Sequence, residues 1–230
     1  MGLELHRLNA NTNPYYQLLK SLDKFEIDLV LDVGANTGQF ASQLRSIGYR
    51  GDIVSFEPLS KEHDLLSMHA SKDPRWKVHE RSAIGDYDGE VEMNISGNSV
   101  SSSIMPMLES HSSAAVDSSY VDVEKVPISC LDSVSSNYIK ESKNIFIKID
   151  TQGYEWQVLN GALDLIKNTK GVLCELSLVP LYEGQKLWKE LIERLESEGF
   201  TLWYIQRGFT DPSNGRALQV DAAFFRTSDV

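Results

Sequence analysis

Acidic residues stand at the ends of four strand-like runs in this sequence. The runs are apolar, and the acids that close them are Asp32, Glu57, Asp150 and Glu175. In open α/β sheets, ligands bind at the carboxyl ends of the parallel strands, so these side chains should meet at one edge of a sheet. Several carboxylates at one edge are costly unless hydrogen-bond donors, a cation or water compensate them. The pattern therefore predicts a polar binding site at that edge.

The segment "LVLDVGANTGQF" (29–40) adds two glycines to the first acid. Gly34 and Gly38 would let a ligand approach the backbone, and the helix that follows offers free N–H groups to an anionic group. The same motif is also typical of a plain strand-to-helix turn. Because Asp32 is anionic, the ligand should also bring a cation or hydroxyl donors, and Glu57 is placed to bind ribose hydroxyls. These demands favour a nucleoside with an ammonium and a carboxylate over a pyrophosphate.

Strand-like and helix-like runs alternate along the chain, which is typical of βαβ units and a mainly parallel sheet. The predicted strands are 27–33, 52–58, 76–84, 120–129, 144–150 and the run "GVLCELSL". The predicted helices are 40–47, 60–70, 154–168 and 185–198. Two last runs, "FTLWYIQ" and "LQVDAAFF", follow each other with only a turn-rich segment between them. We therefore expect a doubly wound α/β fold with a C-terminal antiparallel hairpin.

Two further segments depart from simple alternation. "GDYDGE" followed by "VEMNIS" predicts a hairpin inserted after the third strand, and the serine-rich stretch 96–119 is either a functional lid or a mobile surface insertion. His111 in this stretch is a candidate base if the loop closes over a substrate, and a mobile surface histidine otherwise. We expect residues 1–26 to form an N-terminal extension with a helix from Pro14 to Lys24, which covers the pocket or packs on a second subunit. A single domain spans 27–230.

Composition and charge narrow the function. Hydrophobic residues make up 41% and charged residues 24% of the chain, as in ordinary globular proteins. The net charge of −11 argues against a nucleic-acid partner, which requires a basic surface. Cys130 and Cys174 are too few for a disulfide framework, so we expect both to be reduced. Because the N-terminus lacks a signal-peptide core and no run approaches the roughly 18 apolar residues of a membrane span, we expect a cytoplasmic protein without a membrane partner.

Several segments together resemble the FkbM-type family of class I S-adenosylmethionine-dependent methyltransferases. They are "VLDVGANTGQF", "SFEP", "SAIGDYDGEV", "IKIDTQGYEWQVLNGA", "ELSLVPLYEGQ" and "QVDAAFF", which span residues 28–226. The resemblance implies a seven-stranded Rossmann-like sheet, S-adenosylmethionine as cofactor, and transfer of a methyl group to a hydroxyl of a sugar or natural product. The acceptor is thus a small molecule or saccharide, and its identity and the oligomeric state stay open.

The resemblance also implies which residues bind the cofactor. Those around its methionine part would be Asp32, Gly34, Asn36 and Gly38. Glu57 would bind the ribose, and Ser82 and Ala83 would border the adenine. Many relatives carry glutamate where Gln152 stands, so position 152 is not expected to act as an acid.

Methyl transfer to an alcohol requires a base to accept the hydroxyl proton. Asp150 is the first candidate and Glu175 the second, with a structural role equally open for Glu175. The same two carboxylates could instead hold Mg²⁺, so the metal requirement stays open. Glu155 should complement the start of the helix after Asp150, and Asp221 could be structural. Two other functions remain as alternatives: a nicotinamide-dependent oxidoreductase, and a non-catalytic scaffold with the methyltransferase fold.

Overall fold

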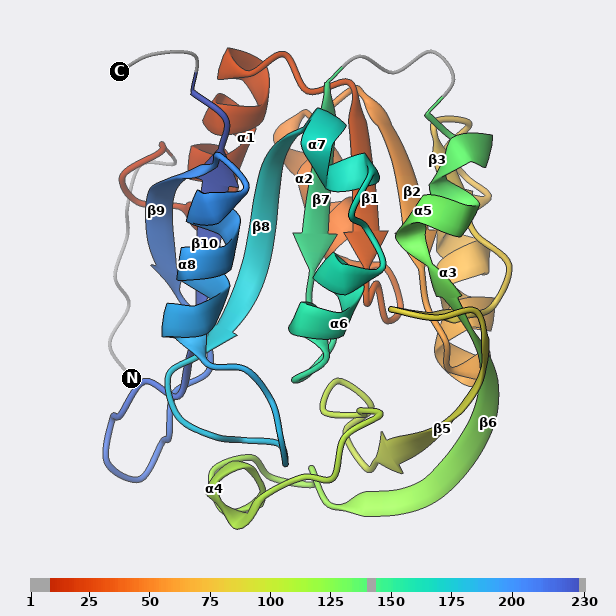
Figure 1. Ribbon diagram of the computed structural model, residues 1–230, viewed down its shortest axis with the longest axis vertical. Helices are drawn as coiled ribbons and strands as arrows, with labels where there is room; N and C mark the ends of the chain where they lie inside the picture. The colour runs from red at the N-terminus through yellow and green to blue at the C-terminus, as the bar shows by residue number, and fades with distance from the viewer. Residues whose placement is uncertain (1–8, 140–143, 228–230) are drawn as a thin grey trace.

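The computed structural model describes residues 9–139 and 144–227, so residues 1–8 of the expected N-terminal extension lie outside the described part of the chain. Two β-sheets organise the described residues. The larger sheet lies between two layers of helices, and the smaller sheet stands beyond the carboxyl ends of its parallel strands (Figure 1). The predicted doubly wound α/β class is confirmed. Both cysteines are free, as expected.

The larger sheet has seven strands within the described residues, in the order β3-β2-β1-β7-β8-β10-β9. In chain order they are β1 (Leu29–Val33), β2 (Asp52–Phe56), β3 (Trp76–Val78), β7 (Ile145–Ile149), β8 (Thr169–Ser177), β9 (Thr201–Arg207) and β10 (Gln219–Phe225). The strands from β3 to β8 in this order pair in parallel, whereas β10 is antiparallel to both β8 and β9. The seven-stranded sheet and its closing hairpin are confirmed.

The two faces of the larger sheet bury separate halves of the core. The front layer in Figure 1 consists of α5 (Leu131–Val134), α6 (Glu155–Asn160), α7 (Leu165–Asn168) and α8 (Trp188–Ser197), and a 3₁₀ turn, η1 (Ser135–Asn137), follows α5. The rear layer consists of α1 (Pro14–Lys24), α2 (Gln39–Ile47) and α3 (Ser60–Ala70). Val30 and Phe146 belong to the rear core. Because side chains alternate along a strand, Asp32 and Lys148 point to the same rear side.

The predicted third strand, 76–84, is two strands in the structure. Its first part is β3, and its second part, β4 (Ala83–Gly85), belongs to the smaller sheet, whose order is β4-β6-β5. β5 (Gly89–Ser96) and β6 (Tyr120–Cys130) pair antiparallel and form the predicted inserted hairpin, while β4 pairs parallel with the end of β6. The run alternates like one strand because both of its parts are extended, and local alternation cannot tell which sheet each part joins.

The single helix predicted over 154–168 is also divided, into α6 and α7. Gly161 ends α6, and a β-carbon there would lie 1.8 Å from the carbonyl oxygen of Gly85. The Asp132 carboxylate accepts hydrogen bonds from the backbone N–H groups of Asp164 and Leu165, 3.0 and 2.8 Å away, where α7 begins. The break therefore arises from contacts with the smaller sheet and α5 that the helical pattern of the sequence does not contain.

The serine-rich stretch 96–119 is packed against the rest of the molecule. It contains a short helix, α4 (Glu109–Ser112), and it forms isolated β-bridges from Ser103 to Asn94 and from Met107 to Tyr182. His111 is only 2% exposed and lies between the rings of Tyr182 and Phe209. The alternative of a mobile surface histidine is therefore wrong.

The close approach of α6 to β4 gives a stability test. Gly161→Ala should lower the free energy of unfolding by about 1 to 3 kcal/mol, because its β-carbon would overlap the Gly85 carbonyl and the backbone there cannot move freely. Gly89→Ala is the matched control, since its β-carbon would meet only the Tyr87 ring at 3.5 Å. Urea unfolding of both variants measures the difference. Equal midpoints for the two variants would mean that the Gly161 contact is unimportant.

Candidate active site

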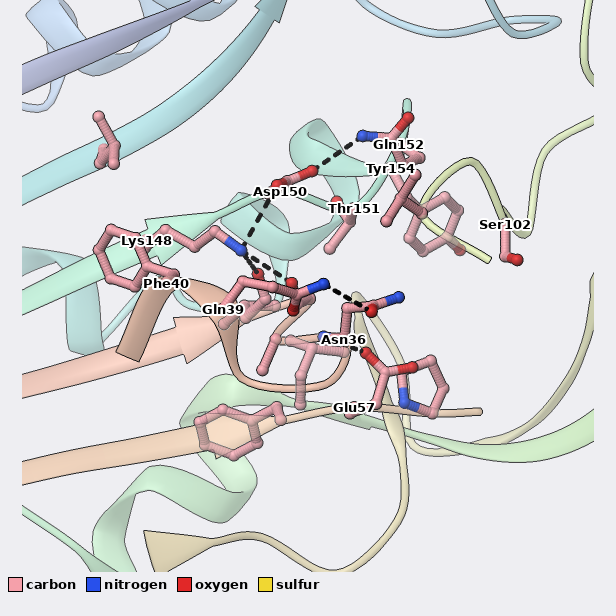
Figure 2. A pocket seen from close by; sticks show the side chains of 18 of the residues that line it. Asn36, Gln39, Phe40, Glu57, Ser102, Lys148, Asp150, Thr151, Gln152 and Tyr154 are labelled. Atoms are coloured by element: carbon pink, nitrogen blue, oxygen red, sulfur yellow. Dashed lines mark hydrogen bonds and ion pairs between the residues drawn. The ribbon is translucent and has the colours of Figure 1, made fainter. Parts of the chain in front are cut away.

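A cavity of about 440 Å³ opens at the carboxyl ends of β1, β2 and β7. The predicted site residues that line it are Gly34, Asn36, Glu57, Ser82, Ala83 and Asp150. Three others, Asp32, Gly38 and Glu175, lie around the cavity without lining it. Further parts of the wall come from α1, the serine-rich stretch and the β9–β10 hairpin. Segments from both ends of the chain thus meet at one site, part of which Figure 2 shows.

Glu57 is held rigidly at the end of β2. Its carboxylate accepts hydrogen bonds from the backbone N–H groups of Asn36 at 2.7 Å and Leu59 at 3.0 Å (Figure 2 shows the first). Burial raises the pKa of Glu57 to about 7, although these two hydrogen bonds lower it. Each carboxylate oxygen can still accept a second hydrogen bond. The geometry therefore suits a ligand that brings hydroxyl donors, such as a ribose.

The glycines of the first loop serve the packing of the chain itself. Gly34 has φ of 75°, and a β-carbon there would lie 1.8 Å from the Asp150 carbonyl oxygen. Gly38 has φ of 90°, and its β-carbon would lie 2.7 Å from the Trp76 ring. Asn36 also adopts a left-handed conformation, with φ of 47°. The loop is therefore fixed in shape before any ligand arrives, and Gly34, Ala35 and Asn36 line the cavity whereas Gly38 does not.

One lining residue of the cavity, Ser82, carries an unsatisfied polar atom. Ser82 is buried, and its hydroxyl has no hydrogen-bond partner among the described residues. Leu59, Ala83 and Ile84 add apolar surface to the lining of the same cavity. A buried hydroxyl without a partner costs free energy, so this wall fits a flat apolar group with a polar edge, as adenine is.

Lys148 is the main member of the site that the sequence prediction missed. It lies in β7 and is 7% exposed, and its ammonium lies 3.3 Å from Asp32 Oδ1 and 3.5 Å from Asp150 Oδ2. Burial alone would lower the pKa of Lys148, but the carboxylates of Asp150 and Asp32 outweigh burial and raise it. The sequence feature that could have identified it is a lysine inside the otherwise apolar run "IFIKI". Lys148 thus supplies a cation to two of the four strand-end acids, Asp32 and Asp150.

Gln152 joins the two candidate bases. Its side-chain amide N–H group donates to Asp150 Oδ1 at 2.9 Å and to Glu175 Oε2 at 2.8 Å, and its amide oxygen accepts a hydrogen bond from the Tyr182 hydroxyl at 2.8 Å. Glu175 Oε2 also accepts from Gln219 at 2.6 Å. Burial, followed by the charges of Asp150, Glu155 and Asp221, raises the pKa of Glu175 well above its ordinary value.

The same network bears on the Mg²⁺ alternative. Asp150 and Glu175 turn their facing oxygens toward one amide donor, which stands where a bridging cation would have to sit. Within residues 9–139 and 144–227, no three His, Cys, Asp or Glu side chains form a group that could hold a metal ion. This donor set does not fit a divalent metal.

The N-terminal helix and the last strand complete the cavity on the Asp150 side. α1 contributes Tyr15 and β10 contributes Asp221. Burial raises the pKa of Asp221 to about 6, and the charge of Asp150 adds to this effect. α1 therefore covers the pocket, which is one of the two roles expected of it. His111, the other candidate base, does not line the cavity.

Glu155 stabilises the loop that carries Gln152. Its carboxylate accepts hydrogen bonds from the N–H groups of Thr151 and Gly153, each at 3.0 Å, at the start of α6. Gln152 has φ of 54°, a strained value for a residue other than glycine, and these hydrogen bonds help to maintain it. The expected position of Glu155 at the helix start is thus confirmed.

Comparisons with known proteins place the fold and then the family. The bacterial Hen1 methyltransferase domain from CtHen1-CN superposes with a TM-score of 0.51 at 11% identity, over 94% of this chain and 100% of that one. Magnesium protoporphyrin IX methyltransferase from Synechocystis PCC 6803 gives a TM-score of 0.50 at 9% identity, over 97% and 87%. The fold is therefore that of the class I methyltransferases.

The family follows from the sequence itself. Residues 32–202 match the model of the methyltransferase FkbM domain, so the chain belongs to this family of S-adenosylmethionine-dependent methyltransferases. No curated protein matches the chain.

No described helix combines the length and the apolar character needed to cross a membrane.

Glu155 provides a test of the electrostatics. Burial raises its pKa to about 7 from 4.5, so the protonated form favours the folded state, and this contribution is lost as the pH rises from about 4.5 through about 7. The loss amounts to roughly 3 kcal/mol of unfolding free energy. Glu155→Gln keeps an oxygen acceptor and should lose less stability than the wild type between pH 5 and pH 8. Urea unfolding at both pH values measures this.

Glu193→Gln, on the exposed face of α8, is the control and should follow the wild-type pH dependence. Glu57 and Asp221 have pKa values raised in the same direction, so all three proteins should still lose some stability at high pH. If Glu155→Gln loses as much stability as the control, the Glu155 carboxyl titrates normally in the folded protein.

Proposed function

We propose that the protein transfers a methyl group from S-adenosylmethionine to a hydroxyl of a saccharide or another small hydroxylated molecule. The observation that carries the proposal is the order of groups along one cavity. In the sheet order, Ser82 with its unpaired hydroxyl and Glu57 come after β3 and β2 on one side of β1, and Asp150 comes after β7 on the other side. A nucleoside and a reacting hydroxyl need these groups in this order.

The cofactor is proposed to bind along the first loop. Glu57 accepts hydrogen bonds from the ribose hydroxyls, and Ser82 and Ala83 border the adenine. Gly34 and Asn36 face the methionine part, while Asp32 and Gly38 support the loop from behind.

When bound, the cofactor supplies an activated methyl group on a sulfonium, and an acceptor oxygen forms its bond to that carbon as the carbon–sulfur bond breaks. Asp150 takes the hydroxyl proton, because it lines the cavity and its side chain is 38% exposed. Glu175 does not line the cavity and is held by two amide groups. It is therefore proposed to act through Gln152, which it helps to orient. The remaining task of the protein is alignment and exclusion of water.

The acceptor is proposed to lie between Asp150, α1 and the serine-rich stretch. Polar uncharged groups are prominent on these walls, including Tyr15, Ser102, Gln152 and Gln206. Such groups donate and accept hydrogen bonds without demanding a charge on the ligand. They support a neutral, hydroxyl-rich acceptor, and the net charge of −11 supports the exclusion of nucleic acids.

Cofactor binding separates this function from its alternatives. Wild-type protein should bind S-adenosylmethionine and S-adenosylhomocysteine in calorimetric titrations and should not bind NADH. Glu57→Gln should weaken S-adenosylmethionine about tenfold or more, because it removes a charge-assisted acceptor from the ribose hydroxyls. Glu193→Gln should bind as the wild type does. Binding of NADH alone would favour the oxidoreductase, and binding of neither molecule would favour the scaffold.

The role of Asp150 is tested by separating binding from turnover. Asp150→Asn should change S-adenosylmethionine affinity less than about threefold, yet slow methyl transfer by about two orders of magnitude or more, since loss of a general base has effects of this size. Transfer of labelled methyl to a panel of methyl glycosides and phenols measures turnover. Wild-type turnover by the Asn variant would remove Asp150 from the role of base.

A further inference from the structure

Asp32 opens the cofactor motif, yet it does not reach the cavity. Its side chain is fully buried, and Oδ2 accepts a hydrogen bond from the Ser55 hydroxyl at 3.2 Å. Oδ1 lies 3.3 Å from the Lys148 ammonium, close enough for an ion pair, but receives no directed hydrogen bond from any described residue. The carboxylate is thus held behind the wall of the site.

Lys148 stands between Asp32 and the cavity that it helps to line. Its ammonium donates to the carbonyl oxygen of Gly34 at 2.8 Å and lies 3.5 Å from Asp150 Oδ2. The Phe40 ring centroid lies 5.7 Å away on another side. Figure 2 shows the ammonium between the first loop and Asp150. One cation therefore connects the loop after β1 to the residue after β7.

Direct contact between Asp32 and a ligand would require Lys148 to move away. The ammonium would then lose the Gly34 carbonyl and both carboxylates, and buried charges that lose their partners are strongly destabilising. The pair is better described as one unit in which Asp32 fixes the ammonium and the ammonium fixes the cavity wall. This arrangement leaves the Gly34 carbonyl and Asp150 as the groups that Lys148 orients.

We propose that Asp32 acts on the cofactor site only through Lys148, and that Lys148 is the positioning residue that joins the Gly34 carbonyl to the Asp150 carboxylate. The proposal rests on the proposed function, because it takes S-adenosylmethionine to be the ligand that binds against the cavity wall held by Lys148. It assigns to the first acid of the motif the role of a counter-ion rather than that of a cofactor ligand.

A double-mutant cycle tests the proposal, with calorimetric titration of S-adenosylmethionine and thermal unfolding of each protein. Lys148→Met should weaken the cofactor about tenfold or more and lower the unfolding midpoint, because it strands the Asp32 carboxylate. Asp32→Asn should weaken the cofactor by a smaller factor on its own, and by less than about twofold once Met stands at position 148. Lys170→Met, an exposed lysine of β8, is the control and should match the wild type.

The double variant separates positioning from mere support of the fold. Removing both charges should recover much of the unfolding midpoint that Lys148→Met loses, because only the partly exposed Asp150 then lacks a counter-ion, while S-adenosylmethionine affinity stays as low as in Lys148→Met. If affinity returns with stability, Lys148 is only structural and the proposal fails. Equal losses from Asp32→Asn in both backgrounds would show an independent contact with the cofactor and would also overturn it.

Two further outcomes are decisive. Should Lys148→Met not fold, the double variant is compared with Asp32→Asn, and binding that is about tenfold weaker in the double variant supports the positioning role. Should the wild type bind no S-adenosylmethionine, the proposed function fails and takes this proposal with it. Wild-type binding with additive losses, in contrast, rejects the positioning role alone.

Discussion

The interaction on which the site depends is the burial of one ammonium among carboxylates at the edge of a parallel sheet. β1, β7, β8 and β10 all place acids near this edge, namely Asp32, Asp150, Glu175 and Asp221. Isolated buried carboxylates would take up protons or unfold the edge. Lys148 offsets the charge of Asp32, next to the first loop. The side-chain amides of Gln152 and Gln219 donate hydrogen bonds to Glu175, farther along the sheet edge.

Because different groups compensate the charges, the site has two regions, one near Lys148 and one formed by the opposite walls. The region near Lys148 is tied to the sheet by backbone carbonyls and is fixed by β1 and β7. The opposite walls come from α1 and the serine-rich stretch, which lie outside the larger sheet, and from the β9–β10 hairpin, which forms one edge of it. A fold that keeps its cofactor groups on the sheet and its other walls on peripheral segments can change its acceptor while conserving the transfer step.

The sequence predicted what depends on local pattern, and it failed where distant contacts decide. The main sheet, its closing hairpin and the cavity residues Gly34, Glu57 and Asp150 followed from apolar runs, the glycine motif and strand-end acids, whereas Asn36, Ser82 and Ala83 followed from the family resemblance. The division of 76–84 and of 154–168 did not, because contacts such as that of Gly161 with Gly85 join distant residues. Asp32 and Glu175 were placed at the right edge, but whether a side chain faces a cavity depends on the neighbours that cover it. Lys148 was visible in "IFIKI" and was read only as part of a buried strand.

Gln152 illustrates how one substitution fits such a charge arrangement. Its amide can donate two hydrogen bonds at once, and here they reach Asp150 and Glu175 while its oxygen accepts from Tyr182. A glutamate at this position would place a third carboxylate against these two. It could not donate to either of them unless it were protonated, so such a site would need an additional proton or cation between the acids. The glutamine makes that extra group unnecessary, and the orientation of Asp150 then depends on an uncharged amide that does not titrate.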